Sequence, residues 1–290
     1  MSVVLVCGGT GLVGSAVCRA LVAAEREVLA TRHRRGGGTD GVAFLDADLT
    51  VPGALGSVTE AEAIVHAAAV LATSFERSEA AAAANEAIDR EVIAVAERTG
   101  AHLLYASGTS LYGAHRDAAP VAESAALAPR GPYLEQKARA EERFAALAGG
   151  FTALRLSAPY GPGQRARTVL QLFVGRALAG KPIEYFGAGT REQDFLWTDD
   201  AADAFVRALG APAGTYNVAS GEHVSMRDLA MLAVDASGAD PALVRAAGWP
   251  DPEEGLTARF DTSAARSALG WTPRTPLGEG LARLVEAART

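Results

Sequence analysis

The chain has 290 residues, of which 49% are hydrophobic and 21% are charged. This length and composition are typical of one large globular domain, or of a domain with a smaller lobe. The formal net charge of −7 argues against a general nucleic-acid-binding protein. No apolar run approaches the ~20 residues of a membrane-spanning helix, and the first residues lack the basic region of a signal peptide. The sequence therefore predicts a cytoplasmic protein without a membrane contact.

The cysteines and histidines are too few and too scattered for a disulfide framework or a metal site. Cys7 and Cys18 are the two cysteines, and neither stands at a metal-ligand spacing. We expect both to be reduced side chains that pack in the core. The five histidines include no His-x-x-x-His pair, so the sequence predicts no metal site.

Short apolar runs alternate with longer amphipathic stretches in the first half of the chain. The predicted strands are residues 3–7, 27–31, 42–45, 63–68, 102–106 and 152–156. The predicted helices between them are residues 12–24, 76–98 and 132–148. This alternation predicts an α/β protein built from βαβ units, with a parallel sheet covered by helices on both faces.

Beyond about residue 160 the alternation fades. The remaining predicted helices are residues 167–179, 200–209, 226–236 and 277–288, with short extended pieces between them. We therefore predict a first domain over residues 1–160 and, over residues 161–290, mainly a smaller C-terminal lobe that is partly interleaved with the sheet.

The segment CGGTGLVG joins the first predicted strand to the first predicted helix and places glycines at positions 8, 9, 11 and 14. Glycines allow a phosphate to approach the backbone closely, and the start of a helix offers it unpaired N–H groups. A strand before the loop and a helix after it are the context that dinucleotide binding requires, so we favour that role over a purely structural turn. The predicted cofactor contacts here are Gly8, Thr10, Gly11, Leu12, Val13 and Gly14.

Arg32 ends the second predicted strand, 18 residues after Gly14. An acidic residue there would bond the ribose hydroxyls, whereas an arginine neutralises a 2′-phosphate. We therefore predict that NADP(H) is preferred, with NAD(H) as the alternative, and interpret the following Arg34 and Arg35 as solvated loop residues. After the third strand, Asp48 could accept a hydrogen bond from the adenine amino group or simply form a turn.

Tyr133 and Lys137 stand four residues apart at the start of the third predicted helix and so share one face. An ammonium group beside a phenol favours the phenolate and lowers a tyrosine pKa of ~10 toward the working range. Such a tyrosine can act as an acid or base next to a nicotinamide. The preceding strand ends in a cluster of hydroxyls around Gly108, which are those of Ser107, Thr109 and Ser110.

In combination and in order, these motifs resemble the extended short-chain dehydrogenase/reductases, the NAD-dependent epimerase/dehydratase family, over nearly the whole chain. The matching segments are residues 8–14, 66–69, 85, 110–113, 132–137, 154–163, 193–204 and 268–273. The resemblance implies a Rossmann-type doubly wound sheet, a substrate lobe, and a homodimer formed through the helices at 76–98 and 132–148. It also implies cofactor contacts from Leu49, Ala67, Ala68, Asn85, Tyr133, Lys137 and Pro159. His66 is expected to be a packed strand residue.

Departures from the family pattern narrow the chemistry. The family's serine or threonine that holds the substrate oxygen falls on Gly108, so a neighbouring hydroxyl must replace it. Thr109 is our first choice as the catalytic hydroxyl, with Ser107 and Ser110 as further substrate contacts. The acid–base Asp-Glu pair of the family's dehydratases falls on Thr109 and Ser110, which disfavours the elimination of water.

The family's usual diphosphate contacts are also altered. Its "RD" arginine is Gln193 here, and its later "R-P-G-D" stretch reads WPDP at 249–252. A diphosphate is normally held by such fixed donors, so their loss weakens the case for a nucleotide-linked substrate. Arg191 and Gln193 remain our predicted substrate contacts in this lobe. The other arginines that could meet a phosphate are Arg155, Arg165, Arg167 and Arg259, of which Arg155 is expected to serve packing.

These observations predict an NADP-dependent oxidoreductase that reduces a keto group of a sugar-like substrate, with Tyr133 as proton donor. A nucleotide-linked 4-keto-6-deoxy sugar is one option for that substrate. The alternative is a nucleotide-sugar epimerase that keeps its cofactor tightly bound. A non-catalytic NADP-sensing protein is less favoured, because a sensor needs neither Tyr133 nor Lys137.

Overall fold

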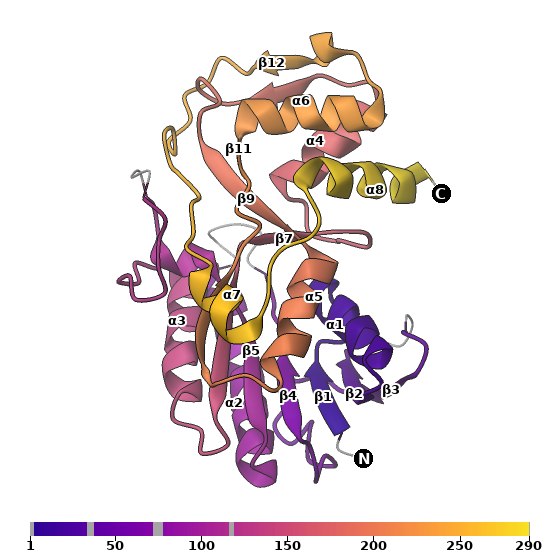
Figure 1. The fold of residues 1–290 in the computed structure, drawn as a ribbon, viewed down its shortest axis with the longest axis vertical. Helices are drawn as coiled ribbons and strands as arrows, with labels where there is room; N and C mark the ends of the chain where they lie inside the picture. Colours follow the sequence, from indigo (N-terminus) through magenta and orange to yellow (C-terminus); the bar gives the residue numbers. More distant parts are fainter. Residues whose placement is uncertain (1–2, 34–37, 72–77, 116–118, 290) are drawn as a thin grey trace.

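The computed structural model describes residues 3–33, 38–71, 78–115 and 119–289 (Figure 1). Arg34 and Arg35, and the first residues of the helix expected from 76, lie outside the described residues. A parallel sheet of seven strands, in the order β10-β6-β5-β4-β1-β2-β3, forms the centre of the larger part. Its strands are β1 (Val3–Cys7), β2 (Glu27–Arg32), β3 (Val42–Asp46), β4 (Ala63–His66), β5 (His102–Gly108), β6 (Phe151–Leu156) and β10 (Gly214–Val218).

Helices cover both faces of this sheet, because successive side chains of each strand point to opposite faces. Val4 and Val6 of β1 join the hydrophobic cluster on one face, and Leu5 and Cys7 join the cluster on the other. The first face carries α1 (Leu12–Ala23), α5 (Thr198–Ala208) and α7 (Ser263–Leu269). The second face carries α2 (Ser78–Thr99) and α3 (Pro132–Phe144). The Rossmann-type doubly wound sheet expected from the sequence is confirmed.

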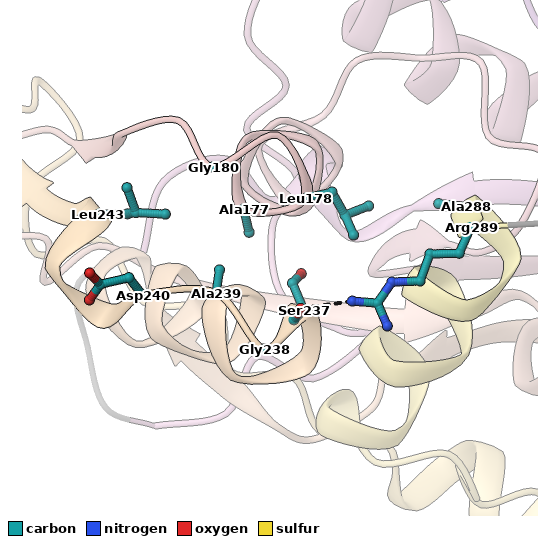
Figure 2. A pocket seen from close by; sticks show the side chains of 10 residues that line it. All are labelled: Ala177, Leu178, Gly180, Ser237, Gly238, Ala239, Asp240, Leu243, Ala288 and Arg289. Atoms are coloured by element: carbon teal, nitrogen blue, oxygen red, sulfur yellow. Dashed lines mark hydrogen bonds between the residues drawn. The ribbon is translucent and has the colours of Figure 1, made fainter.

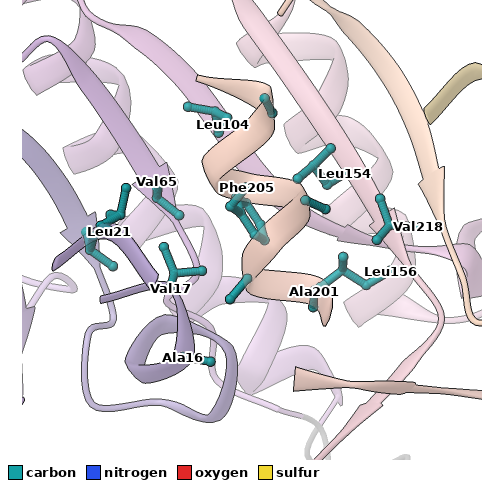
Figure 3. Packing of buried hydrophobic residues seen from close by; sticks show 14 of the residues in the cluster. Ala16, Val17, Leu21, Val65, Leu104, Leu154, Leu156, Ala201, Phe205 and Val218 are labelled. Carbon is teal, nitrogen blue, oxygen red and sulfur yellow. The ribbon is translucent and has the colours of Figure 1, made fainter. Parts of the chain in front are cut away.

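Residues beyond 160 complete the first face of the sheet. Figure 3 shows Phe205 of α5 packed against sheet residues that include Leu104 and Leu154. β10 pairs with β6 and becomes an edge strand of the same sheet. The sequence did not predict β10, because its segment GTYNV interrupts the apolar run with Gly214 and Asn217.

The smaller lobe lies beyond the carboxyl ends of the central strands (Figure 1). Its helices are α4 (Val169–Leu178), α6 (Met226–Ser237) and α8 (Leu277–Arg289). Its strands are β7 (Ala158–Tyr160), β8 (Ile183–Tyr185), β9 (Glu192–Trp197), β11 (His223–Ser225) and β12 (Val244–Ala246). They form the sheets β11-β9-β7 and β12-β8 and share a core of their own with the three helices. None of these short strands was predicted from the sequence.

The segment at 247–262 joins the smaller lobe to the larger part. Thr257 forms a β-bridge with His115, and Phe260 forms one with Val121. Both partners follow the end of β5, so the returning segment runs beside the loops at the carboxyl ends of the strands. In folds of this class, ligands bind at that edge of the sheet.

Candidate functional site

The glycine loop between β1 and α1 is tightly packed. A Cβ atom at Gly8, where φ is +90°, would lie 2.8 Å from the backbone of Ala68, and one at Gly14 would lie 2.1 Å from the carbonyl oxygen of Gly8. Gly11 caps α1 without a side-chain hydrogen bond, so the first N–H groups of the helix are available to an anion. Thr10, Leu12 and Val13 lie within the same turn and are half-buried. This loop fits the pyrophosphate of a dinucleotide.

At the end of β2, Arg32 is held beside β3. Its Nε lies 2.5 Å from Oδ1 of Asp46, and its guanidinium lies 5.2 Å from the ring centroid of Phe44. Asp48 accepts hydrogen bonds from the backbone and hydroxyl of Thr50 at 3.0 and 2.6 Å, which form a turn and lower the pKa of Asp48. Leu49 buries its side chain in the core, which leaves its backbone for a cofactor contact.

The loop after β4 lies beside the glycine loop. The backbone N–H of Ala67 donates to the carbonyl of Cys7 at 3.0 Å, and the backbone of Ala68 occupies the space that a Cβ atom on Gly8 would need. Asn85 of α2 binds the backbone of Val70 on both sides, accepting at 2.8 Å and donating at 3.1 Å. Its amide therefore positions the loop after β4, and its direct contact with the cofactor stays a prediction.

Helix α3 presents Tyr133 and Lys137 at its start. Gly131, with φ of +85°, and Pro132 at the first helical position set the turn into the helix. The backbone N–H of Tyr133 donates to the hydroxyl of Ser78 at 3.1 Å, which joins the beginnings of α3 and α2. The two predicted catalytic side chains therefore share one helix face near the carboxyl end of β5.

Lys137 is bonded to β5 and not to Tyr133. Its Nζ donates to the Tyr105 hydroxyl at 3.0 Å and to the Ala106 carbonyl at 2.7 Å, and it lies 4.3 Å from the Tyr105 ring centroid. Burial lowers the pKa of Lys137 to about 8, although Asp89 and Glu141 act to raise it. Burial also raises the pKa of Tyr133. The expectation that Lys137 would lower the Tyr133 pKa is wrong for this arrangement, because the ammonium is engaged elsewhere.

The hydroxyls after β5 differ in what they can reach. Ser107 is 4% exposed and donates a hydrogen bond to Glu141, and its contact with the substrate stays a prediction. Thr109 is 7% exposed, whereas Ser110 is exposed. A Cβ atom at Gly108 would lie 3.2 Å from the Ser110 hydroxyl oxygen. The geometry therefore favours Ser110 over Thr109 as the group that replaces the missing hydroxyl.

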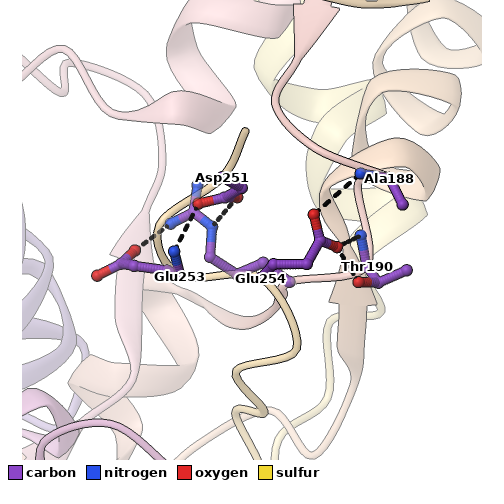
Figure 4. Close-up of polar contacts among 6 residues, drawn as sticks. Ala188, Thr190, Asp251, Glu253 and Glu254 are labelled. Atoms are coloured by element: carbon purple, nitrogen blue, oxygen red, sulfur yellow. Dashed lines mark hydrogen bonds and ion pairs between the residues drawn. The ribbon is translucent and has the colours of Figure 1, made fainter. Parts of the chain in front are cut away.

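The predicted substrate residues of the smaller lobe lie around β7 and β9. Arg191 precedes β9 and forms ion pairs with Asp251 and Glu253 at 3.1 and 2.8 Å (Figure 4). Gln193 stands opposite Val224 in the β9–β11 ladder and is half-buried, and Pro159 lies within β7. The arrangement brings Pro159 near the carboxyl edge of the main sheet but leaves Arg191 neutralised.

Comparison with known proteins decides the family. Residues 4–219 match the family model described as "NAD dependent epimerase/dehydratase family". This match covers well over half of the chain. The chain belongs to this family. The resemblance drawn from the glycine loop, Asn85, Tyr133 and Lys137 is thereby confirmed.

Individual family members are similar over part or all of the chain. The chain is 35% identical over 202 residues to a UDP-glucose 4-epimerase of Mycolicibacterium smegmatis, covering 63% of this chain and 60% of that enzyme. It is 29% identical over 196 residues to a dTDP-4-dehydro-6-deoxyglucose reductase of Escherichia coli, covering 63% and 60%. The chain thus spans less than two thirds of the length of these curated relatives.

Solved structures of the family share the fold over the full chain. The UDP-glucose 4-epimerase of Thermotoga maritima, solved with UDP-glucose, superposes with a TM-score of 0.89 at 24% identity, covering 99% of this chain and 98% of that one. The UDP-glucose 4-epimerase of Thermus thermophilus, solved with NAD, superposes with a TM-score of 0.86 at 25% identity, covering 99% of each chain.

Sequence reasoning missed two residues of this family site that the structure brings in. Tyr105 accepts from Lys137, and Glu141 holds both Ser107 and Arg155. Glu141 follows Lys137 by four residues on the same helix face, which is a signal that the spacing already contained. No spacing in the sequence indicates Tyr105, because its contact with Lys137 depends on how α3 packs against β5.

His66 and the two cysteines are buried side chains. His66 is buried and bonds Asp89 at 3.0 Å, and burial raises the pKa of the Cys7 thiol to about 12. Across residues 3–33, 38–71, 78–115 and 119–289, no group of three or more His, Cys, Asp or Glu side chains could hold a metal ion. None of the helices in this described part has the length and apolarity to cross a bilayer.

One cavity lies away from every predicted site residue. It has a volume of about 600 Å³ and lies between the ends of α4, α6 and α8 (Figure 2). Arg289 closes one side by donating to the carbonyl of Ser237 at 2.8 Å. Its position at the far end of the smaller lobe separates it from Tyr133 and the glycine loop.

Proposed function

We propose that this family member is an NADP(H)-dependent oxidoreductase that reduces the keto group of a sugar-like substrate, with Tyr133 as proton donor. The observation that carries the proposal is the placement of Tyr133, Lys137 and the exposed Ser110 hydroxyl at the carboxyl end of β5. The same edge of the sheet carries the glycine loop. The relation to an E. coli reductase of a keto-deoxy sugar supports this reaction class.

Each residue has a role that follows from its chemistry. The glycine loop and the start of α1 would hold the pyrophosphate, and Arg32 would hold the 2′-phosphate. The nicotinamide, when bound, supplies the hydride. Tyr133 gives its phenolic proton to the substrate oxygen. Lys137 holds this face of α3 against β5 through the Tyr105 hydroxyl and the Ala106 carbonyl. Ser110 orients the substrate oxygen by hydrogen bonding.

A nucleotide-sugar epimerase is the second proposed function, because the relative at 35% identity is a UDP-glucose 4-epimerase. An epimerase oxidises and re-reduces one carbon and so returns its cofactor unchanged. The two functions differ in a property of the purified protein. A reductase releases its cofactor and consumes NADPH with a ketone, whereas an epimerase retains its cofactor and shows no net NADPH use.

The deciding experiment is a screen of free and nucleotide-linked keto-sugars with NADPH. The decrease in NADPH absorbance measures the consumption of the cofactor. We expect net oxidation of NADPH with at least one keto-sugar and its loss in Tyr133→Phe. A protein that purifies with bound cofactor and consumes no NADPH with any ketone would replace the reductase by the epimerase.

Cofactor preference rests on Arg32 and is tested separately from turnover. We expect NADPH to bind more tightly than NADH, and Arg32→Ala to remove most of that difference. Losing one charge-assisted contact to a phosphate weakens binding by roughly tenfold or more. Fluorescence titration of both cofactors measures the two constants. Equal affinities in the unmutated protein would contradict the preference, and relatives with bound NAD make that outcome a real alternative.

The remaining proposals concern the oligomeric state and the location of the protein in the cell. We propose a homodimer that forms through α2 and α3, the helices expected to meet across the interface. The cytoplasmic location stays a prediction, to be tested by cell fractionation.

A further inference from the structure

A carboxylate of α2 is buried where this helix meets α3. Asp89 is 2% exposed, and α2 and α3 lie side by side on the second face of the sheet (Figure 1). Burial of a carboxylate is costly unless hydrogen bonds or an opposite charge compensate for the loss of water. The partners of Asp89 therefore show in which form its side chain is held.

Both oxygens of Asp89 meet buried side chains of other elements. Oδ1 lies 3.0 Å from Nε2 of His66 on β4, and Oδ2 accepts a hydrogen bond from Nε2 of Gln136 on α3 at 2.5 Å. Gln136 is 2% exposed and immediately precedes Lys137 in the chain. Asp89 thereby links α2 to β4 and to the turn of α3 that carries Lys137.

We assign the tautomer of His66 from its second ring nitrogen. In the described part of the chain, Nδ1 of His66 is the one buried side-chain nitrogen or oxygen without a hydrogen-bond partner. A buried N–H group without a partner is rarer in proteins than an acceptor without one, so Nδ1 carries no proton and Nε2 donates to Asp89. With a donor facing each of its oxygens, Asp89 is an ionised carboxylate.

Asp89 differs in its pairing from the other carboxylate near Lys137. Glu141 pairs with Arg155 at 2.6 Å, which neutralises its charge. Among the residues that the structure describes, no lysine or arginine lies within ion-pair distance of Asp89, and its histidine partner is uncharged in the assigned tautomer. The negative charge of Asp89 is therefore left to act on Lys137.

Lys137 carries the positive charge on the other side of Tyr105. Its ammonium contacts two neutral acceptors, the Tyr105 hydroxyl and the Ala106 carbonyl. The Tyr105 ring lies next to both groups, with Nζ of Lys137 at 4.3 Å and the centroid of the His66 ring at 5.2 Å from its own centroid. In a buried region of low dielectric constant, opposite charges attract each other without direct contact.

The electrostatic effects on Lys137 have the same direction as this geometry. Burial lowers the pKa of Lys137, and the charges of Asp89 and Glu141 oppose that decrease. The titratable side chains of this cluster besides Lys137 are Tyr105 of β5, His66 of β4, Asp89 of α2, and Tyr133 and Glu141 of α3.

We propose that Asp89 is a positioning residue of the site: its buried charge keeps Lys137 in the ammonium form, which fastens the face of α3 that carries Tyr133 to β5. Charge-assisted hydrogen bonds are roughly twice as strong as those between neutral groups, so the ammonium holds β5 more firmly than the neutral amine would. The proposal rests on the proposed function only for the task of Tyr133.

Lysine labelled with ¹³C at Cε reports the charge of Lys137 when Lys181→Arg removes the other lysine of the chain. In this background we expect Asp89→Asn to lower the midpoint of the Lys137 titration by about one pH unit, because an opposite charge is lost. The substitution keeps the size of the side chain and both hydrogen bonds. Its amide oxygen accepts from His66, and Gln136 turns its own amide to accept from the amide nitrogen. A carboxylate that served only as a structural link would therefore leave the midpoint unchanged.

The matched control is Asp199→Asn, which removes an exposed carboxylate on the other face of the sheet, paired with Arg19 at 3.2 Å. Water and salt screen such a charge, so the midpoint should stay within about 0.2 pH unit of the parent value. The proposal is overturned if Asp89→Asn leaves the midpoint unchanged or raises it. Equal shifts in Asp89→Asn and Asp199→Asn would overturn it as well.

A second measurement leaves Asp89 in place and so also covers a variant that fails to fold. ¹⁵N NMR of labelled histidine in the parent chain should show a proton on Nε2 of His66 and none on Nδ1, with the signal assigned by replacing the four other histidines one at a time. A proton on Nδ1 would leave the His66–Asp89 pair without a net charge and would contradict the proposal. Neither measurement needs cofactor or substrate, so an absence of NADPH oxidation would refute the proposed function without affecting this result.

Discussion

Gly108 leaves space at the end of β5 into which the Ser110 hydroxyl reaches. The hydroxyl oxygen lies 3.2 Å from the position that a Cβ atom of residue 108 would take. Thr109, one residue earlier, points its side chain into a buried environment. The hydroxyl that is missing at position 108 can therefore be replaced by the exposed hydroxyl of Ser110. One group would then orient the substrate.

We expect Ser110→Ala to lower turnover with a keto-sugar by roughly 10²-fold, the lower range for removing one positioned contact in a reaction of this kind. NADPH binding should be unchanged. Thr109→Val keeps its shape and should cost much less, while Tyr133→Phe should cost at least as much as Ser110→Ala. Steady-state rates measure all three. If Thr109→Val lowers turnover strongly and Ser110→Ala does not, the hydroxyl that orients the substrate is that of Thr109.

The charge of Lys137 depends on its buried surroundings. The chain contains only two lysines, Lys137 and Lys181, so a Lys181→Arg variant labelled with ¹³C at lysine Cε gives a single signal. We expect that signal to titrate near pH 8, because burial lowers the pKa of Lys137 to about 8. The ammonium is charged below that pH and neutral above it.

Tyr105 provides the control for this titration. Its hydroxyl accepts from the charged ammonium, so Tyr105→Phe should favour the neutral amine and move the midpoint to lower pH. The Ala106 carbonyl remains as an acceptor and limits the shift. A midpoint near the ordinary lysine value of about 10.4, or a rise in Tyr105→Phe, would contradict this account.

At the scale of elements, a buried polar network fastens the catalytic helix α3 to the sheet. Glu141 of α3 accepts from Arg155 of β6 at 3.1 and 2.6 Å and also from Ser107 of β5. Arg155 continues to the Tyr112 hydroxyl at 3.0 Å, which donates to Asn217 of β10 at 2.6 Å. The network thereby joins α3 to three neighbouring strands.

Breaking this pair should destabilise the fold. Glu141→Ala leaves the Arg155 charge buried without its partner, which costs about 3–5 kcal/mol of the free energy of unfolding. The control is Arg19→Ala, which breaks an exposed pair with Asp199 away from α2 and α3 and should cost under about 1 kcal/mol. Urea denaturation followed by circular dichroism measures both. Equal losses in the two variants would mean that the buried pair contributes nothing special.

At the scale of the whole molecule, the proposed homodimer makes α2 and α3 an interface. Light scattering at micromolar concentration should give twice the chain mass of 29.8 kDa. Reversing the charge of an exposed residue of these helices, as in Arg139→Glu, should shift the mass toward that of one chain while the circular dichroism spectrum is kept. A monomer in the unmutated protein would remove the dimer and leave the fold as described.

The larger part and the smaller lobe of the molecule are not separated at one point of the chain. Division of the chain at residue 160 stays a prediction. The structure adds that β10 and α5, both beyond that residue, complete the main sheet and cover one face of it. The second half therefore contributes to both cores.

Local patterns in the sequence determined the alternating strands and helices, the glycine loop and the placement of Tyr133 and Lys137 on one helix face. Each of these depends on spacing within one element or one turn, which is why residue order alone reveals it. The tertiary structure alone decided that Lys137 binds Tyr105, that Arg191 is neutralised by Asp251 and Glu253, and that β10 joins the sheet. These are contacts between elements distant in sequence, and no local period encodes them because they arise only when the elements pack together.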